Sequence, residues 1–171
     1  ALGKDIERGH LGVPGNNYNL LLQRSTDFVP YLFAVMGYYQ DSRDRQVLLA
    51  LTQMKWDAVD PATHWPHVSQ VPHPGTAKDK RALLASAKGD WQVALVSNEI
   101  LVRSGVGVKL LPHYGRAVQG VAVTPYPHEG SGLVNFDFGN PWPEPGNATP
   151  QDSLGDPHGK PRQLAWHNEQ M

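Results

Sequence analysis

The chain has 171 residues, and its 15 basic and 16 acidic side chains leave a formal net charge of −1. A nearly neutral protein without a long basic run is not typical of nucleic-acid binders, which neutralise phosphates with clustered lysine and arginine. Cysteine is absent, so disulfides, thiol catalysis and cysteine-ligated metal centres are excluded. No apolar run approaches the roughly 20 residues that cross a membrane as a helix, and we therefore expect no transmembrane segment.

The chain begins at Ala1 rather than at a methionine. This start is compatible with removal of a signal peptide and equally with origin as a piece of a larger protein. The absence of cysteine fits an exported protein that has no bridges. We therefore expect an extracytoplasmic or secreted location.

The first forty residues contain two apolar segments between turn-forming residues. Residues 1–9 fit a short helix closed by a glycine, and a turn-rich loop follows over residues 10–17. We expect strands over residues 18–24 and 31–39, separated by a proline. The leucine run in the first of these segments fits a buried helix equally well, because periodicity does not separate the two over so short a stretch.

A helix is predicted to begin at Asp41 or Ser42, either of which can accept a hydrogen bond from a first-turn amide. Val47 and Leu51 then lie at helical spacing, although the pattern leaves a strand open as the alternative. The next segment, residues 60–75, holds four prolines, a glycine and three histidines. We expect it to be a long loop with a functional role.

The stretch from Thr76 to Phe138 forms the centre of the predicted fold. Thr76 can cap a helix that Gly89 ends, with leucines between them at helical spacing. Several short runs of alternating apolar residues follow, and these indicate strands. The predicted strands cover residues 91–96, 106–110, 121–123 and 134–138. Glycines and prolines between the runs favour antiparallel neighbours, whereas residues 97–103 fit either a short helix or a continued strand.

Together these patterns predict an α+β fold, with an antiparallel or mixed sheet of about five to seven short strands and two main helices. We expect one globular domain over residues 1–138 and an extended arm over residues 139–171, which is rich in proline and glycine. The arm is predicted to pack on the domain or on a partner. Trp142 and Trp166 are its expected anchors, because each carries a large apolar ring.

The proline-rich loop contains the densest group of metal-ligand side chains, namely His64, His67 and His73. Neutral imidazoles bind zinc, copper or nickel, and Asp57 or Asp60 can add a carboxylate. The spacing differs from that of a helical zinc motif with a glutamate base between two histidines. One interpretation is a divalent-metal site, with zinc as the expected ion, and the other is an ordinary surface loop.

Residues 7–23 contain the sequence Arg-Gly-His-Leu followed by Asn-Leu, which resembles the core of the ββα-metal endonucleases. The resemblance implies that His10 is the base that activates water and that Asn19 supports a Mg²⁺ ion. Without the resemblance, the same residues are interpreted as a turn rich in glycine and asparagine.

Two further histidines stand at predicted strand ends. These are His113 and His128, and the second is followed directly by Glu129. A histidine beside a carboxylate can act as acid and base where two loops meet. The candidate catalytic residues are therefore His10, His113, His128 and Glu129.

Aromatic residues beside turns and prolines suggest a different function, because an exposed ring can anchor a protein partner. The candidate binding residues are Trp65, Trp142 and Trp166. We expect a non-catalytic binding or assembly domain of an exported or larger protein, whose arm contacts a protein partner or another part of a larger chain. The alternative is a metal-dependent hydrolase, with a ββα-metal nuclease as a minor variant. A hydrolase gathers several histidines in one pocket, whereas a binding domain scatters them and exposes an aromatic patch.

Overall fold

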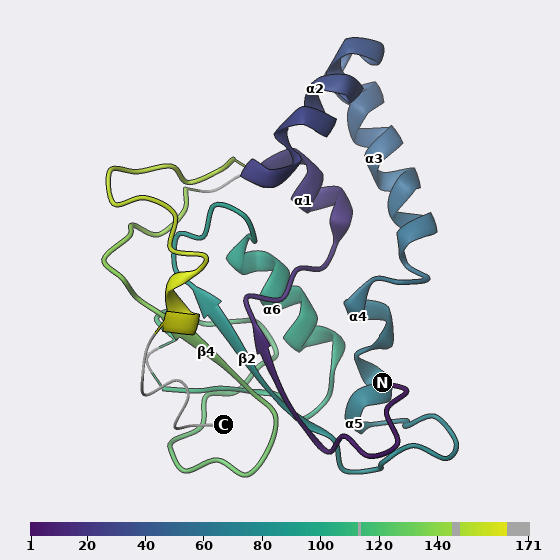
Figure 1. The fold of residues 1–171 in the computed structure, drawn as a ribbon, viewed down its shortest axis with the longest axis vertical. Coiled ribbons are helices and arrows are strands. Elements are labelled where there is room, and N and C mark those ends of the chain that lie inside the picture. Colours follow the sequence, from purple (N-terminus) through teal and green to yellow (C-terminus); the bar gives the residue numbers. More distant parts are fainter. Residues whose placement is uncertain (113, 145–147, 164–171) are drawn as a thin grey trace.

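The computed structural model describes residues 1–112, 114–144 and 148–163, and over these residues it forms a parallel sheet with helices around it (Figure 1). The strands in the described part stand in the order β1-β2-β4-β3. Their bounds are Arg8–Gly12 for β1, Arg81–Ala87 for β2, Lys109–Leu110 for β3 and Gly132–Phe136 for β4. The α-helices are Tyr18–Arg24 (α1), Val29–Tyr38 (α2), Ser42–Trp56 (α3), Pro61–His64 (α4), Pro66–Ser69 (α5) and Leu95–Ser104 (α6). Two 3₁₀ turns, Thr26–Phe28 (η1) and Lys160–Gln163 (η2), complete the assignment.

The predicted antiparallel or mixed sheet of five to seven strands is wrong. Within the described residues the sheet has four strands, and each neighbouring pair is parallel. Parallel neighbours need long crossover connections, which here contain helices α1 to α5 between β1 and β2, and α6 between β2 and β3. The glycines and prolines that suggested hairpins lie in those connections and loops instead.

The largest local error concerns β2, which was expected to be part of a helix starting at Thr76. This segment is a central strand, paired with β1 on one side and β4 on the other. Most of its residues are buried, because a parallel strand has both faces covered and so becomes a nearly continuous apolar run. Such a run imitates helical spacing, which explains the wrong assignment.

The segments expected to be strands at residues 18–24 and 31–39 are helices α1 and α2. Pro30 lies in the first turn of α2, where the missing amide hydrogen of proline costs no helical hydrogen bond. The predicted helix cap at Asp41 is confirmed, since its side chain accepts a 2.8 Å hydrogen bond from the backbone N–H of Arg43 at the start of α3.

Later predicted strands are confirmed only in part. Residues 132–136 form β4, and only two residues of the predicted strand at 106–110 form β3. The segment at 91–96 leads into α6 instead of forming a strand. The 121–123 segment contributes two isolated bridges.

The core lies mainly on the sheet face that α6 covers. Leu84, Leu110 and Leu133 from three strands are fully buried there, together with Leu101 from α6. A smaller cluster that includes Ala85, Val134 and Phe136 occupies the opposite face. β1 leads toward α1, and helices α2 and α3 project beyond the edge at which the strands end (Figure 1). We call this edge the carboxyl edge.

The described part of the C-terminal arm packs against the body. Pro157 and Pro161 are fully buried, and the side chain of Asp156 accepts hydrogen bonds from the loop after β2. None of the helices in the described residues is long and apolar enough to cross a membrane.

Candidate functional site

The candidate site begins at the turn that follows β2 on the carboxyl edge. Gly89 has a φ of 75°, and a Cβ atom placed on it would lie 2.7 Å from the Cβ of Asn140. Glycine is therefore needed for both the backbone conformation and the close approach of the arm. The turn brings the next residue, Asp90, back against the end of the sheet, where its backbone N–H donates to the carbonyl of Ala87.

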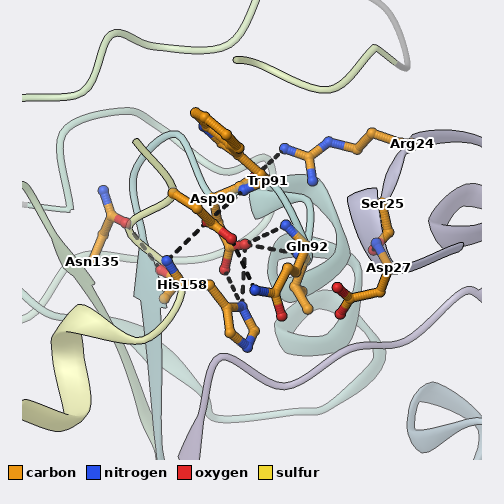
Figure 2. A network of polar contacts seen from close by, with 11 residues as sticks. Arg24, Ser25, Asp27, Asp90, Trp91, Gln92, Asn135 and His158 are labelled. Carbon is orange, nitrogen blue, oxygen red and sulfur yellow. Dashed lines mark hydrogen bonds and ion pairs between the residues drawn. The ribbon is translucent and has the colours of Figure 1, made fainter. Parts of the chain in front are cut away.

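Asp90 is a buried carboxylate that is held from several sides (Figure 2). Its Oδ1 accepts hydrogen bonds of 2.8 Å from the backbone N–H groups of Gln92 and Val93. Its Oδ2 lies 2.9 Å from Nδ1 of His158. The residue is only 2% exposed, so these contacts replace the water that a carboxylate otherwise needs.

His158 reaches Asp90 from the C-terminal arm, 68 residues further along the chain. Its position is fixed by the fully buried Pro157 before it and by a 3.0 Å hydrogen bond from its backbone N–H to Oδ1 of Asp156. A carboxylate only accepts hydrogen bonds, so the neutral imidazole carries its hydrogen on Nδ1 and leaves Nε2 with a free lone pair. The side chain is 16% exposed, which leaves this ring partly accessible.

A second carboxylate joins the arm to the turn that carries Asp90. Asp156 accepts hydrogen bonds from the backbone N–H of Trp91 at 3.1 Å and from Nε2 of Gln92 at 2.8 Å. The arm and the turn are therefore connected by the Asp90–His158 pair and also by these two bonds.

Arg24, the last residue of α1, is the cation of this network. Only 4% of the residue is exposed. Its Nη2 donates to the backbone carbonyl of Asp90, and its own carbonyl accepts from the hydroxyl of Thr149 in the arm. Burial lowers the pKa of the guanidinium, while the charges of Asp90 and Asp156 act in the opposite direction.

The carboxyl edge is where ligand sites form in parallel sheets, because the loops that follow the strands converge there. The sequence analysis did not identify Asp90 or His158. The available signal was a Gly-Asp pair one residue after a buried strand, together with a histidine between a proline and a glycine in the arm. Recognising it required the correct assignment of β2 as a strand.

The predicted catalytic residues lie elsewhere. His10, His128 and Glu129 all line one hollow of about 1240 Å³ near the starts of β1, β2 and β4, at the opposite edge of the sheet. Nε2 of His128 is 3.3 Å from the carbonyl oxygen of Ser131. The fourth of these residues, His113, lies outside the described residues. Their catalytic role stays a prediction.

The three histidines of the predicted metal site are only partly brought together. The rings of His67 and His73 stack with their centroids 4.1 Å apart, and both this neighbour and burial lower the pKa of His73, burial being the larger cause. Nδ1 of His67 contacts the carbonyl of Val71 at 2.7 Å, and Nε2 of His64 contacts that of Ala58 at 2.9 Å. Within the residues that the structure describes, no three side chains of metal-ligand type converge.

The predicted binding tryptophans have different surroundings. Trp65 is buried in the main core, and its ring lies so close to Gly105 that a side chain there would clash. Trp142 is partly exposed, and its ring centroid lies 5.6 Å from Nζ of Lys88 and 5.2 Å from Cζ of Arg116. Trp166 lies outside the described residues.

The chain matches no protein-family model, no curated protein and no solved structure. The local chemistry of the network around Asp90 is therefore the basis for a functional proposal.

Proposed function

We propose that this chain carries the acid and the base of a hydrolase that acts through an activated hydroxyl group. The observation that supports the proposal is the 2.9 Å contact between Oδ2 of the buried Asp90 and Nδ1 of His158 at the carboxyl edge of a parallel sheet. This is the relation between acid and base in a Ser-His-Asp triad, where the carboxylate fixes the imidazole tautomer and stabilises the imidazolium that forms.

The chemistry assigned to the pair has two steps. Nε2 of His158 takes the proton of the hydroxyl as its oxygen attacks an acyl carbonyl, and the imidazolium then gives that proton to the leaving group. Water, deprotonated by the same nitrogen, next cleaves the acyl–oxygen bond, which releases the acid and restores the hydroxyl. Throughout, Asp90 stays ionised and holds the ring.

The pair requires a hydroxyl nucleophile at Nε2 of His158. Within the described residues, Nε2 of His158 makes no hydrogen bond to a hydroxyl group. In hydrolases that build a triad on a parallel sheet, the nucleophile follows a strand, precedes the acid in the chain, and the histidine comes last. Asp90 and His158 already stand in that order. We infer that the nucleophile lies before Asp90 in the chain.

A fluorophosphonate probe tests this function directly, because it forms a phosphorus–oxygen bond only with an activated hydroxyl and releases fluoride. We expect the natural gene product that contains this chain to be labelled at one serine, and a His158→Gln variant to lose at least about 100-fold of the labelling rate. Peptide mapping of the adduct identifies the serine.

The matched control is His64→Gln, because that histidine contacts a backbone carbonyl away from the site. This variant is expected to keep the wild-type labelling rate. If the folded wild-type protein is not labelled, or if His158→Gln is labelled as fast as wild type, Asp90 and His158 form a structural ion pair and the hydrolase proposal fails.

A second candidate function, binding of a protein partner, is supported by the apolar surface of the projection formed by α2 and α3. Phe33 is 66% and Tyr38 is 87% exposed. Further exposed apolar side chains of the projection are Tyr31, Met36, Val47, Leu51 and Met54. Clusters of exposed apolar side chains mark interaction sites more often than isolated ones do.

Site-specific photocrosslinking in the source cells tests the binding function. We expect a benzoylphenylalanine at position 33 to give a discrete protein adduct. The same group at position 106, which is also well exposed but far from the projection, is expected to give none. Adducts of equal yield from both positions, or none from position 33, would count against a partner on this surface.

A further inference from the structure

We propose that Arg24 is a positioning residue for the base, acting through Asp90 and supplying the counter-charge that keeps His158 able to accept a proton. The proposal rests on the proposed function only in calling His158 a base. Its structural grounds are independent, namely the placement and burial of the Arg24 guanidinium.

The first ground is the balance of charge around His158. Asp90 contacts its ring, and Asp156 accepts from its backbone N–H while also holding the turn after β2. In general, negative charge close to an imidazole stabilises its protonated form, and a nearby cation opposes that effect. Arg24 is the buried cation that interacts with both carboxylates, so it cancels part of this attraction.

The second ground is that Arg24 fixes the Asp90 turn itself. Nη2 donates to the carbonyl of Asp90, and the carbonyl of Arg24 accepts from the Thr149 hydroxyl. One residue at the end of α1 therefore touches both the turn that carries the acid and the arm that carries the base. Figure 2 shows the guanidinium directed at the backbone of this turn, on the opposite side from the imidazole.

The third ground is an unusual buried donor. Nη1 of Arg24 is inaccessible to solvent and makes no hydrogen bond to any described residue. Leaving such a donor buried is destabilising, so packing alone is a poor explanation for an arginine here. The free-energy cost of the unpaired donor is explained if the positive charge of Arg24 has a role at this position.

Other charged groups near the arm do not provide the counter-charge that we assign to Arg24. Asp27 on η1 is exposed. On η2, Lys160 lies over the ring of Phe138 and Arg162 packs beside Gly12. Among the described cations, only Arg24 hydrogen-bonds to the turn that carries Asp90.

The test is the titration of the His158 ring, followed by nuclear magnetic resonance in the absence of substrate. Replacing Arg24 by glutamine removes the charge and keeps a polar amide group in the side chain. We expect the titration midpoint of His158 to move up by about one pH unit in Arg24→Gln. Arg24→Lys, which keeps the charge, is expected to titrate close to wild type.

Asp156→Asn provides the opposite change, since it removes a negative charge and keeps an acceptor for Trp91. The titration midpoint of His158 is expected to move down in this variant. In the double variant Arg24→Gln/Asp156→Asn, the midpoint is expected to return close to the wild-type value. An unchanged midpoint in folded Arg24→Gln, or an equal rise in Arg24→Lys, overturns the proposal. If Arg24→Gln does not fold, the Asp156→Asn variant decides. The absence of a downward shift in its His158 titration midpoint then refutes the charge balance. Because no step uses substrate, these outcomes are separate from a failure of the hydrolase proposal.

Discussion

Replacing Asp90 by asparagine is expected to lower the hydrolytic kcat of the natural gene product by about 10⁴-fold, the loss that follows neutralisation of the carboxylate in a Ser-His-Asp triad. The amide oxygen can still accept from the backbone N–H groups of Gln92 and Val93, so the turn keeps its shape. The amide nitrogen, however, would then face Nδ1 of His158. It donates there, which forces the ring hydrogen onto Nε2 and leaves no lone pair for the nucleophile.

The measurement is kcat for an activated ester, with circular dichroism to establish that the variant is folded. The control is Asp152→Asn, a matched substitution in the same arm whose carboxylate is bonded to Asn140 and to the backbone of Leu154 rather than to His158. We expect this control to keep activity within a few-fold of wild type. A folded Asp90→Asn variant that loses less than tenfold contradicts a triad role for Asp90.

Shortening Leu133 to alanine is expected to lower the free energy of unfolding by about 3–5 kcal/mol. Leu133 is fully buried in β4 and is in register with Leu84 on one side and Leu110 on the other. Removing its side chain therefore leaves a cavity that two neighbouring strands and α6 surround. The loss is a large fraction of the stability of an ordinary domain.

Urea unfolding gives this change directly, provided that the slope with denaturant is unchanged. Leu51→Ala is the matched control, because the same atoms are removed from an exposed position on α3. Its effect is expected to stay below about 0.5 kcal/mol. Equal losses in the two variants would mean that the β4 side chain does not pack as described.

Local signals in the sequence were sufficient for some elements. The Asp41 cap marks the start of α3 because a short acceptor side chain can satisfy an amide of the first helical turn. The alternation through Val134 and Phe136 likewise indicates β4. Both patterns depend only on near neighbours in the chain.

The sheet could not be predicted in the same way, because strand direction is decided by distant pairing. The apolar run in β2 has the composition of a helix, and only its burial between β1 and β4 makes it a strand. When β2 is interpreted as a helix, the turn after it does not lie at the edge of a sheet. Nothing then indicates that Asp90 belongs to a site.

The candidate site depends on a contact between residues that are far apart in the sequence. Asp90 and His158 are separated by 68 residues, and nothing near His158 in the sequence points to its partner. The predicted histidine groups drew attention because they are close in sequence, yet closeness in sequence does not bring imidazoles to a common point. His64 and His67 illustrate this, since each contacts its own nearby backbone carbonyl.

The position of His158 on the arm has a consequence for synthesis on the ribosome. All described strands lie before residue 137, so the sheet and Asp90 leave the exit tunnel ahead of the histidine. At the usual rate of about 5–20 residues per second, His158 emerges several seconds after Asp90. Until the arm docks, the turn after β2 lacks the contacts that Asp156 and His158 make with it. Translation that stops before the arm would therefore release a chain in which the Asp90 carboxylate lacks its imidazole partner.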